Sequence, residues 1–437
     1  MPTDVSFLMR MPLPSALRAL HSRNYRLFVV GQLISLVGTW MQSVAQSWLI
    51  YRLTGSAALL GLIGFAGQIP IFLLAPLGGL LADRLNRHRV LIATQTTMMV
   101  LAFALAALTL GGIVREWQIF VLASLLGVVN AFDIPTRQAF LAETVSRDDI
   151  VNAIALNSSM LNGARIVGPA IAGIVVAAFG EGWCFLLNAI SYLAVIGALL
   201  MMHVEQVPHP GAHVSAWESI IEGFVYSWNT EPVRALLLLL GLVSLMGMPY
   251  SVLMPVIASS VLGGGPNAYG VLMAASGVGA LAGAALLTLR QNVRGLGRWV
   301  AVSAVSFGIT LIAFSFSRAL WLSTALLVPA GFFMMVEMAA SNTLIQSMIP
   351  NRLRGRVMSV YSMMFMGMAP MGALVAGALA APLGAPATVA IGGSICAVGG
   401  VVFGARLPRL RGPARKLIVA QQLSAGSPAD EATPLRE

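Results

Sequence analysis

The chain has 437 residues, of which 58% are hydrophobic and only 10% are charged, and its mean hydropathy is +0.84. A soluble domain cannot bury so much apolar surface, so the composition excludes a soluble protein and indicates one that crosses a membrane many times. The net charge of +10 does not indicate nucleic-acid binding, because the basic residues gather in short segments between apolar runs.

The apolar runs predict twelve membrane-spanning helices, since one helical crossing needs roughly 20 residues. We expect an all-α membrane protein in which residues 1–204 form a cytoplasmic leader and an N-terminal six-helix bundle. The helices of this half are expected at about 24–53, 57–82, 90–112, 118–141, 150–179 and 183–203.

A polar connector at residues 205–232 separates the two halves. After Pro208 and Pro210, large apolar residues recur at helical spacing and predict a short amphipathic helix at the cytoplasmic surface: Trp217, Ile220, Ile221, Phe224 and Trp228. A C-terminal six-helix bundle over residues 233–407 follows, with helices at about 233–262, 267–289, 297–316, 319–347, 355–381 and 384–406. Residues 408–437 turn from basic to polar and are predicted to be a disordered cytoplasmic tail.

The basic residues are distributed unequally across this topology. It places 22 Lys and Arg on one side, one inside the membrane (Arg165) and three on the other side (Arg52, Arg115 and Arg318). Cytoplasmic loops carry the excess of basic residues, so both termini are expected in the cytoplasm.

The second and third apolar runs are joined by a charged segment, Gly79 to Arg89. One acid and three arginines cannot lie in hydrocarbon, so this segment is predicted to be a tight hairpin at the membrane surface. Gly79 is expected to allow close helix packing, Asn86 to adopt a left-handed turn, and Asp83 to face an arginine or a helix N-terminus.

Two features indicate an internal repeat. Gly127 and Asp133 in the fourth helix match Gly331 and Glu337 in the tenth, with an offset of 204 in both cases. The prolines of the fifth and eleventh helices, Pro169 and Pro370, differ by 201. The pattern predicts two parallel repeats.

No constellation of catalytic residues or phosphate-binding loop is apparent, so we expect neither an enzyme nor ATP-driven transport, and no cofactor. Cys184 and Cys396 are expected to be small core residues. His209 and His213 have helical spacing but no third ligand nearby, so no metal site is predicted.

Ionisable residues inside a membrane are functional candidates. Asp133 and Arg137 are four residues apart, which favours a structural ion pair over proton carriage by Asp133. Arg165 lies near the midplane with no acid within a helical turn. It must meet an acid of another helix, helix carbonyls or an anionic substrate, and the sequence leaves these alternatives open.

The Gly79–Arg89 segment resembles the loop 2–3 signature of the major facilitator superfamily, with Asn86 in place of a glycine. Residues 164–173 resemble the helix 5 antiporter motif of that superfamily, with Ala164 and Ala172 in place of glycines. A narrower resemblance is to the bacterial subfamily that includes the enterobactin exporter, often called transmembrane secretion effectors, and it rests on residues 24–28, 40–46, 53–56, 133–140 and 354–359.

This resemblance implies two six-helix bundles that rock around a central cavity, and a direction of export. It also implies an inner gate in which Asp133 pairs with the arginines of the first charged loop, and Glu337 with those of the equivalent loop in the second half. The gate and coupling residues are thus expected to be Asp83, Arg84, Arg87, Asp133, Arg137, Glu337, Arg354 and Arg356.

The predicted function is proton-driven export of a siderophore or another amphipathic small molecule across a bacterial inner membrane, by a monomer in the lipid bilayer. The alternatives are a multidrug or macrolide exporter, an uptake symporter, and a non-transporting sensor or scaffold.

Met residues cluster on the tenth and eleventh helices, where they suit either varied apolar ligands or ordinary packing. The residues expected to line the cavity are Gln42, Gln46, Asn157, Asn162, Arg165, Asn342 and Tyr361.

Overall fold

The computed structural model describes residues 15–202, 216–290 and 293–424. Within this part of the chain, twelve helical segments are long and apolar enough to cross a membrane, which confirms the predicted all-α membrane fold. A short 3₁₀ helix, η2 (Ser15–His21), comes first. The N-terminal bundle then consists of α1 (Arg23–Thr54), α2 (Ala57–Arg84), α3 (Arg87–Leu110), α4 (Glu116–Leu141), α5 (Ile150–Phe179) and α6 (Glu181–Met201), with η3 (Arg147–Asp149) before α5.

The second half begins with the connector helix α7 (Ala216–Asn229). The seventh crossing consists of α8 (Glu231–Leu242), η4 (Val243–Gly247), η5 (Met248–Ser251), α9 (Met254–Val256) and η6 (Ile257–Val261). The remaining crossings are α10 (Pro266–Leu289), α11 (Leu296–Phe316), α12 (Leu320–Met348), a compound segment and α15 (Ala385–Ser424). The compound segment comprises η7 (Asn351–Leu353), α13 (Arg354–Ser362), η8 (Met363–Gly367) and α14 (Met368–Leu383).

Prolines explain why the seventh and eleventh crossings are interrupted where the sequence predicted continuous helices. Proline lacks the N–H that would donate to the preceding turn, so the helix changes locally to π or 3₁₀ geometry. Pro249 lies in such a 3₁₀ turn, and Pro370 follows the π turn η8 by three residues.

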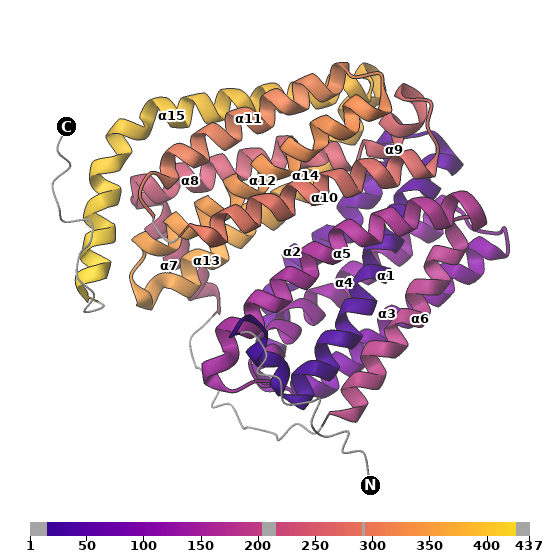
Figure 1. The fold of residues 1–437 in the computed structure, drawn as a ribbon, viewed down its shortest axis with the longest axis horizontal. Helices are drawn as coiled ribbons and strands as arrows, with labels where there is room; N and C mark the ends of the chain where they lie inside the picture. The colour runs from indigo at the N-terminus through magenta and orange to yellow at the C-terminus, as the bar shows by residue number, and fades with distance from the viewer. Residues whose placement is uncertain (1–14, 203–215, 291–292, 425–437) are drawn as a thin grey trace, which may run out of the picture.

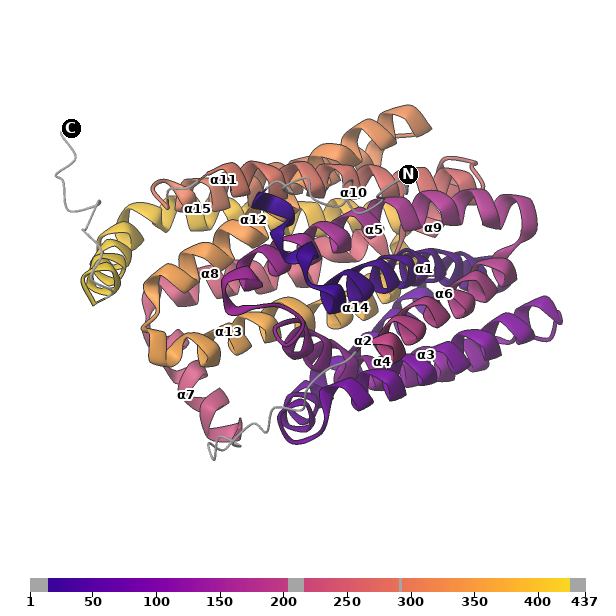
Figure 2. The ribbon, with the colours of Figure 1, turned by 60° about the horizontal axis from the view of Figure 1, so that its bottom comes forward.

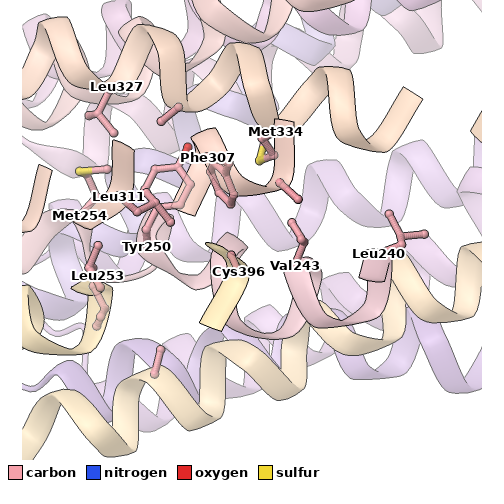
Figure 3. Packing of buried hydrophobic residues seen from close by; sticks show 14 of the residues in the cluster. Leu240, Val243, Tyr250, Leu253, Met254, Phe307, Leu311, Leu327, Met334 and Cys396 are labelled. Carbon is pink, nitrogen blue, oxygen red and sulfur yellow. The ribbon is translucent and has the colours of Figure 1, made fainter. Parts of the chain in front are cut away.

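The core of the C-terminal bundle forms around the interrupted seventh crossing. Figure 3 shows Tyr250 beside Phe307, with Cys396 nearby, and the two rings meet edge to face with their centroids 6.2 Å apart. The Tyr250 hydroxyl shares a 2.5 Å hydrogen bond with Ser276, which satisfies this polar group inside the apolar core. Both cysteines are buried and free, as the sequence predicted.

The two halves repeat the same packing. Gly127 of α4 packs against the Gly67 carbonyl of α2, and Gly331 of α12 packs against the Ser276 carbonyl of α10. A side chain at either glycine would collide with the neighbouring backbone, so both helix pairs depend on glycine at this position. The predicted repeat therefore corresponds to equivalent helix pairs.

The two bundles meet at one end of the molecule and diverge toward the other (Figure 1). We call the diverging end the arginine-rich end, because Arg84, Arg87 and Arg89 and the arginines at 294, 298, 352, 354 and 356 lie at the helix ends there. The end where α1 meets α2 and α5 meets α6 is called the opposite end.

The C-terminal segment differs from the sequence prediction. Residues 408–424, expected to belong to a disordered tail, continue α15 as a helix, whereas residues 425–437 lie outside the described part of the chain. Leu407, Leu410 and Ile418 explain the difference, because they recur at helical spacing and are only 8%, 4% and 7% exposed. Figures 1 and 2 show this extension turning across the end of the C-terminal bundle.

Two predictions about the Gly79–Arg89 hairpin are wrong. Gly78, and not Gly79, packs closely on α4 at the Ala131 carbonyl, while a Cβ at Gly79 would meet no atom within 4 Å. Asn86 is extended, with φ −65° and ψ 107°, and its side chain accepts a hydrogen bond from the Arg89 backbone N–H at 3.0 Å. Asn86 thus serves as the N-cap of α3, a role that asparagine fills readily.

Candidate functional site

Glycines hold the two bundles together at the opposite end. A Cβ at Gly270 of α10 would lie 2.6 Å from the Pro169 carbonyl oxygen and 2.8 Å from the Gly173 Cα of α5. On the other side of the molecule, Gly61 of α2 meets Gly377 of α14, where a Cβ at Gly377 would lie 2.9 Å from the Gly61 Cα. Such contacts between backbones are possible only for residues without bulky side chains.

Aromatic and hydroxyl groups of α1 add to this closure. The Tyr51 hydroxyl shares a 2.5 Å hydrogen bond with Ser260, and Trp48 stacks on Tyr269 with ring centroids 6.2 Å apart. Both contacts join the N-terminal to the C-terminal bundle near the opposite end, so the closed end has polar as well as apolar contacts.

The close contact between α5 and α10 extends from the opposite end to the middle of the molecule, and Arg165 lies at its inner limit. A Cβ at Gly277 of α10 would be 3.1 Å from the Arg165 carbonyl oxygen. The Arg165 guanidinium lies over the Trp40 ring of α1, 5.7 Å from the ring centroid. Among the described residues, no Asp or Glu lies within ion-pair distance of Arg165, so a cation–π contact takes the place of the acid that the sequence left open.

Two residues expected to line the cavity lie inside a bundle instead. Gln42 is 7% exposed and its side-chain carbonyl accepts a 2.7 Å hydrogen bond from Asn188 of α6. Tyr361 is 6% exposed and its hydroxyl donates to the Met338 carbonyl at 3.0 Å. Both side chains are occupied by packing within their own bundle, so we remove them from the cavity set.

The other four uncharged candidates are half-buried: Gln46, Asn157, Asn162 and Asn342. The Asn162 amide donates to the Ser158 carbonyl of its own helix at 2.9 Å, and Asn342 accepts from Gln346 one turn further on. Each of these two asparagines thus has one local hydrogen bond and remains partly accessible. In the Met cluster, Met334 and Met335 are buried, whereas Met366 and Met371 are exposed.

Asp133 is fully enclosed in the N-terminal bundle and well satisfied. It is 1% exposed, and one carboxylate oxygen accepts hydrogen bonds from Thr94 at 2.8 Å and from Gln95 at 2.9 Å. The other oxygen lies 3.6 Å from the Arg137 guanidinium, so the predicted ion pair with the residue four positions on is present. Asp133 thus has a cation and two hydrogen-bond donors, which favours a structural role for this carboxylate.

Glu337 occupies the repeat-equivalent position with a very different environment. It is also 1% exposed, but its hydrogen bond within the described residues is a 3.2 Å contact from the Ser341 hydroxyl. No Lys or Arg of the described chain forms an ion pair with it, so the expected pairing with Arg354 or Arg356 is wrong in this conformation. A carboxylate without a cation is costly to keep charged in such surroundings.

The arginines of the predicted gate have other partners. Arg87 forms a 2.6 Å ion pair with Glu143 and donates to the Ala82 carbonyl at 2.8 Å, so its expected pairing with Asp133 is also wrong. Arg356 pairs with Glu222 of the connector helix α7, and Arg352 lies 3.7 Å from the same carboxylate. Arg84 and Arg354 are exposed, and the Asp83 side chain lies outside the described residues.

The sequence reasoning missed three acids that make these contacts. Glu143 and Glu222 are the partners just described, and Glu181 binds Arg52 through two hydrogen bonds of 2.6 and 3.1 Å at the opposite end. Glu143 and Glu181 lie beside or in predicted loops, and Glu222 lies in the predicted connector helix at the membrane surface, so the sequence indicated a solvated acid at each position. One feature of the sequence could have indicated these pairs. The chain has 16 Asp and Glu for 26 Lys and Arg, so each arginine has few acids with which it can pair.

Two six-helix halves of repeated packing, closed at one end and diverging at the other, define a transporter of the major facilitator superfamily. A family model described as transmembrane secretion effector matches residues 14–423. The chain therefore belongs to this family and is a multi-pass membrane transporter.

Several characterised relatives are similar to this chain over most of their length. The staphyloferrin A transporter of Staphylococcus aureus is 25% identical, over 84% of this chain and 93% of its own. The multidrug efflux pump Tap of Mycolicibacterium fortuitum is 26% identical, over 88% and 96%. The macrolide efflux protein A of Streptococcus pyogenes is 24% identical, over 71% and 75%.

Solved structures support the fold alone, because their sequence identity is low. A point mutant of the nucleoside transporter NupG matches with a TM-score of 0.71 at 15% identity, covering 87% of this chain and 99% of that one. A bacterial homologue of the lysosomal transporter Spinster, in an inward-facing and unoccupied conformation, matches with a TM-score of 0.66 at 13% identity, covering 91% and 97%.

Proposed function

We propose that this protein exports small amphipathic molecules across a bacterial inner membrane by alternating access, as a monomer with both termini in the cytoplasm. The observation that carries the proposal is the contrast between the ends: glycine contacts close the opposite end, and the bundles diverge at the arginine-rich end. The positive-inside rule assigns the arginine-rich end to the cytoplasm, so this conformation faces inward.

The proposed substrate is a siderophore-like molecule. The similarity to the staphyloferrin A transporter supports this class. Arg165 supports it independently, because its cationic group lies at the depth where the bundles begin to diverge and, among the described residues, has an aromatic ring in place of an acid. An anionic group of a substrate would replace this contact with a stronger, charge-assisted one. Gln46, Asn157, Asn162 and Asn342 are proposed to supply further polar contacts.

We assign the coupling proton to Glu337 rather than to Asp133. Asp133 has a cation and two hydrogen-bond donors, whereas Glu337 has one hydroxyl partner among the described residues. A buried carboxylate that gains and loses a proton during transport must be tolerated in its neutral form, and the surroundings of Glu337 meet this condition. Asp83, Arg84, Arg87, Arg137, Arg354 and Arg356 remain proposed residues of the cytoplasmic gate.

The test is transport by the purified protein in proteoliposomes under an imposed pH gradient. A catecholate siderophore, a macrolide and a cationic dye are offered separately. Gradient-dependent movement of the siderophore alone would support the proposal, and loss of that movement in Arg165→Ala would support the role of this residue.

A multidrug or macrolide exporter is the second candidate, because Tap and the macrolide efflux protein are also relatives. Movement of the dye and the macrolide would favour it. Gradient-driven accumulation in the direction of uptake would instead favour a symporter, and movement of none of the three would contradict the proposed substrate class.

A further inference from the structure

A cavity of about 510 Å³ lies at the arginine-rich end of the C-terminal bundle, away from the contacts between the bundles. The start of α8, the start of α11, the end of α12 and the C-terminal part of α15 form its walls. Most of the lining is apolar and includes Leu236, Leu344, Met348, Phe403 and Leu407.

The C-terminal extension of α15 completes the cavity because it is amphipathic. Leu407, Leu410 and Ile418 on one face are nearly inaccessible and also line the cavity. Arg411 and Arg415 border this face, so the extension contributes both an apolar wall and positive charge.

Four arginines line the cavity, and its described lining residues include no Asp or Glu. Arg294 and Arg415 already have interaction partners, so the argument rests on Arg298 at the start of α11 and Arg411 on α15. Both are exposed. A ligand that matches this site must combine a negative charge at the edge with hydrocarbon in the interior.

We propose that this cavity binds a membrane phospholipid with an anionic headgroup. The phosphate would lie between Arg298 and Arg411, and an acyl chain would cover Leu344, Phe403 and the neighbouring apolar wall. Basic pockets between transmembrane helices on the cytoplasmic side are suited to anionic headgroups. The lipid would join α11 to the α15 extension. This lipid site is independent of the proposed export function.

The two other possible occupants match the site less well. A soluble anion could pair with the arginines but would leave the apolar interior of the cavity unfilled. The chain's own residues 425–437 carry three acids (Asp430, Glu431 and Glu437) but a single large apolar residue, Leu435, so they offer little hydrocarbon.

The experiment uses the full chain, purified in detergent and depleted of lipid. It is titrated with phosphatidylglycerol or with phosphatidylcholine of the same acyl chains, and bound lipids are counted by native mass spectrometry. We expect one phosphatidylglycerol to be held more tightly than phosphatidylcholine. Arg298→Gln with Arg411→Gln should weaken phosphatidylglycerol binding about 25-fold, because each arginine near an anionic headgroup contributes about fivefold.

Arg406→Gln with Arg409→Gln is the matched control, because it removes the same charge from two exposed positions of α15 that do not line the cavity. It should leave phosphatidylglycerol binding within about twofold of the unmodified chain. Equal weakening by both pairs would overturn the proposal and indicate unspecific surface attraction.

Two further outcomes would also overturn it. Displacement of phosphatidylglycerol by an equal concentration of inorganic phosphate would indicate a site for soluble anions. A requirement to neutralise Asp430, Glu431 and Glu437 before lipid binds would indicate that the chain's own C-terminal residues occupy the cavity.

Discussion

Replacing Gly270 with alanine is expected to weaken the closed end of this transporter. The new Cβ would lie 2.6 Å from the Pro169 carbonyl oxygen and 2.8 Å and 3.0 Å from Gly173 Cα and N. These are backbone atoms, so no side-chain rotation can relieve the contact. Since van der Waals contact is optimal at about 3.5 Å, α5 and α10 must separate by roughly 0.7–0.9 Å.

The two helices belong to different bundles, so a rotation that parts the bundles at the opposite end relieves the collision without distorting either bundle. Overpacking of a close contact costs about 1–3 kcal/mol. If this cost falls only on the state that is closed at the opposite end, the ratio of this state to the state that is open there decreases by about 5- to 150-fold.

Pulsed electron paramagnetic resonance can measure this change through spin labels at Ile113 and Phe316. These residues are 63% and 72% exposed and lie at the opposite end of the N-terminal and C-terminal bundles. We expect longer distances between the labels in Gly270→Ala. The control is Gly163→Ala on α5, where a Cβ would meet no atom within 4 Å. An unchanged distance distribution in a folded Gly270→Ala protein would refute the reasoning.

Three substitutions test the ionisable residues. Arg165→Lys keeps the charge but loses the planar guanidinium that could donate two hydrogen bonds to an anionic group of the substrate. Substrate KM should rise by about 10-fold or more, because a hydrogen bond to a charged group contributes about 1.5–3 kcal/mol; an unchanged KM in the transport assay would contradict a role in binding. Glu337→Gln should retain substrate binding but lose transport driven by a pH gradient, and persistence of gradient-driven accumulation would exclude Glu337 as the proton carrier. Asp133→Asn should lower stability by about 1–3 kcal/mol, because Arg137 loses its counterion, while gradient-driven transport remains; loss of coupling at normal thermal stability would contradict this assignment.

The number of crossings and their approximate limits could be predicted from the sequence because hydrocarbon imposes a length and an apolar composition on every helix. The pairing of Asp133 with Arg137 was accessible for a similar reason, since residues four positions apart on one helix are neighbours whatever the rest of the chain does. Local geometry was sufficient in both cases.

The remaining contacts depend on how helices are rotated about their axes, which the sequence specifies weakly. One residue is about 100° of rotation in an α-helix, and the close contact with α4 therefore falls on Gly78 and not on the adjacent Gly79. Gln42 was assigned to the cavity because it is polar, but Asn188, 146 residues later, provides its partner inside the bundle. The helical spacing of apolar residues in the α15 extension indicated a helix. The nearby prolines and basic residues led to the prediction of a disordered tail instead.

The internal repeat allows the packing of the two halves to be compared with the surroundings of their buried acids. Gly127 and Gly331 have the same packing role in the two halves, so backbone geometry at this level of the bundles is shared. Six residues later in each half lies a buried acid, yet Asp133 meets Thr94, Gln95 and Arg137, whereas Glu337 meets Ser341. The partners of the two acids thus differ although the glycine packing six residues before them is the same. This difference in charge compensation within repeated packing supports the proposal that Glu337, and not Asp133, carries the coupling proton.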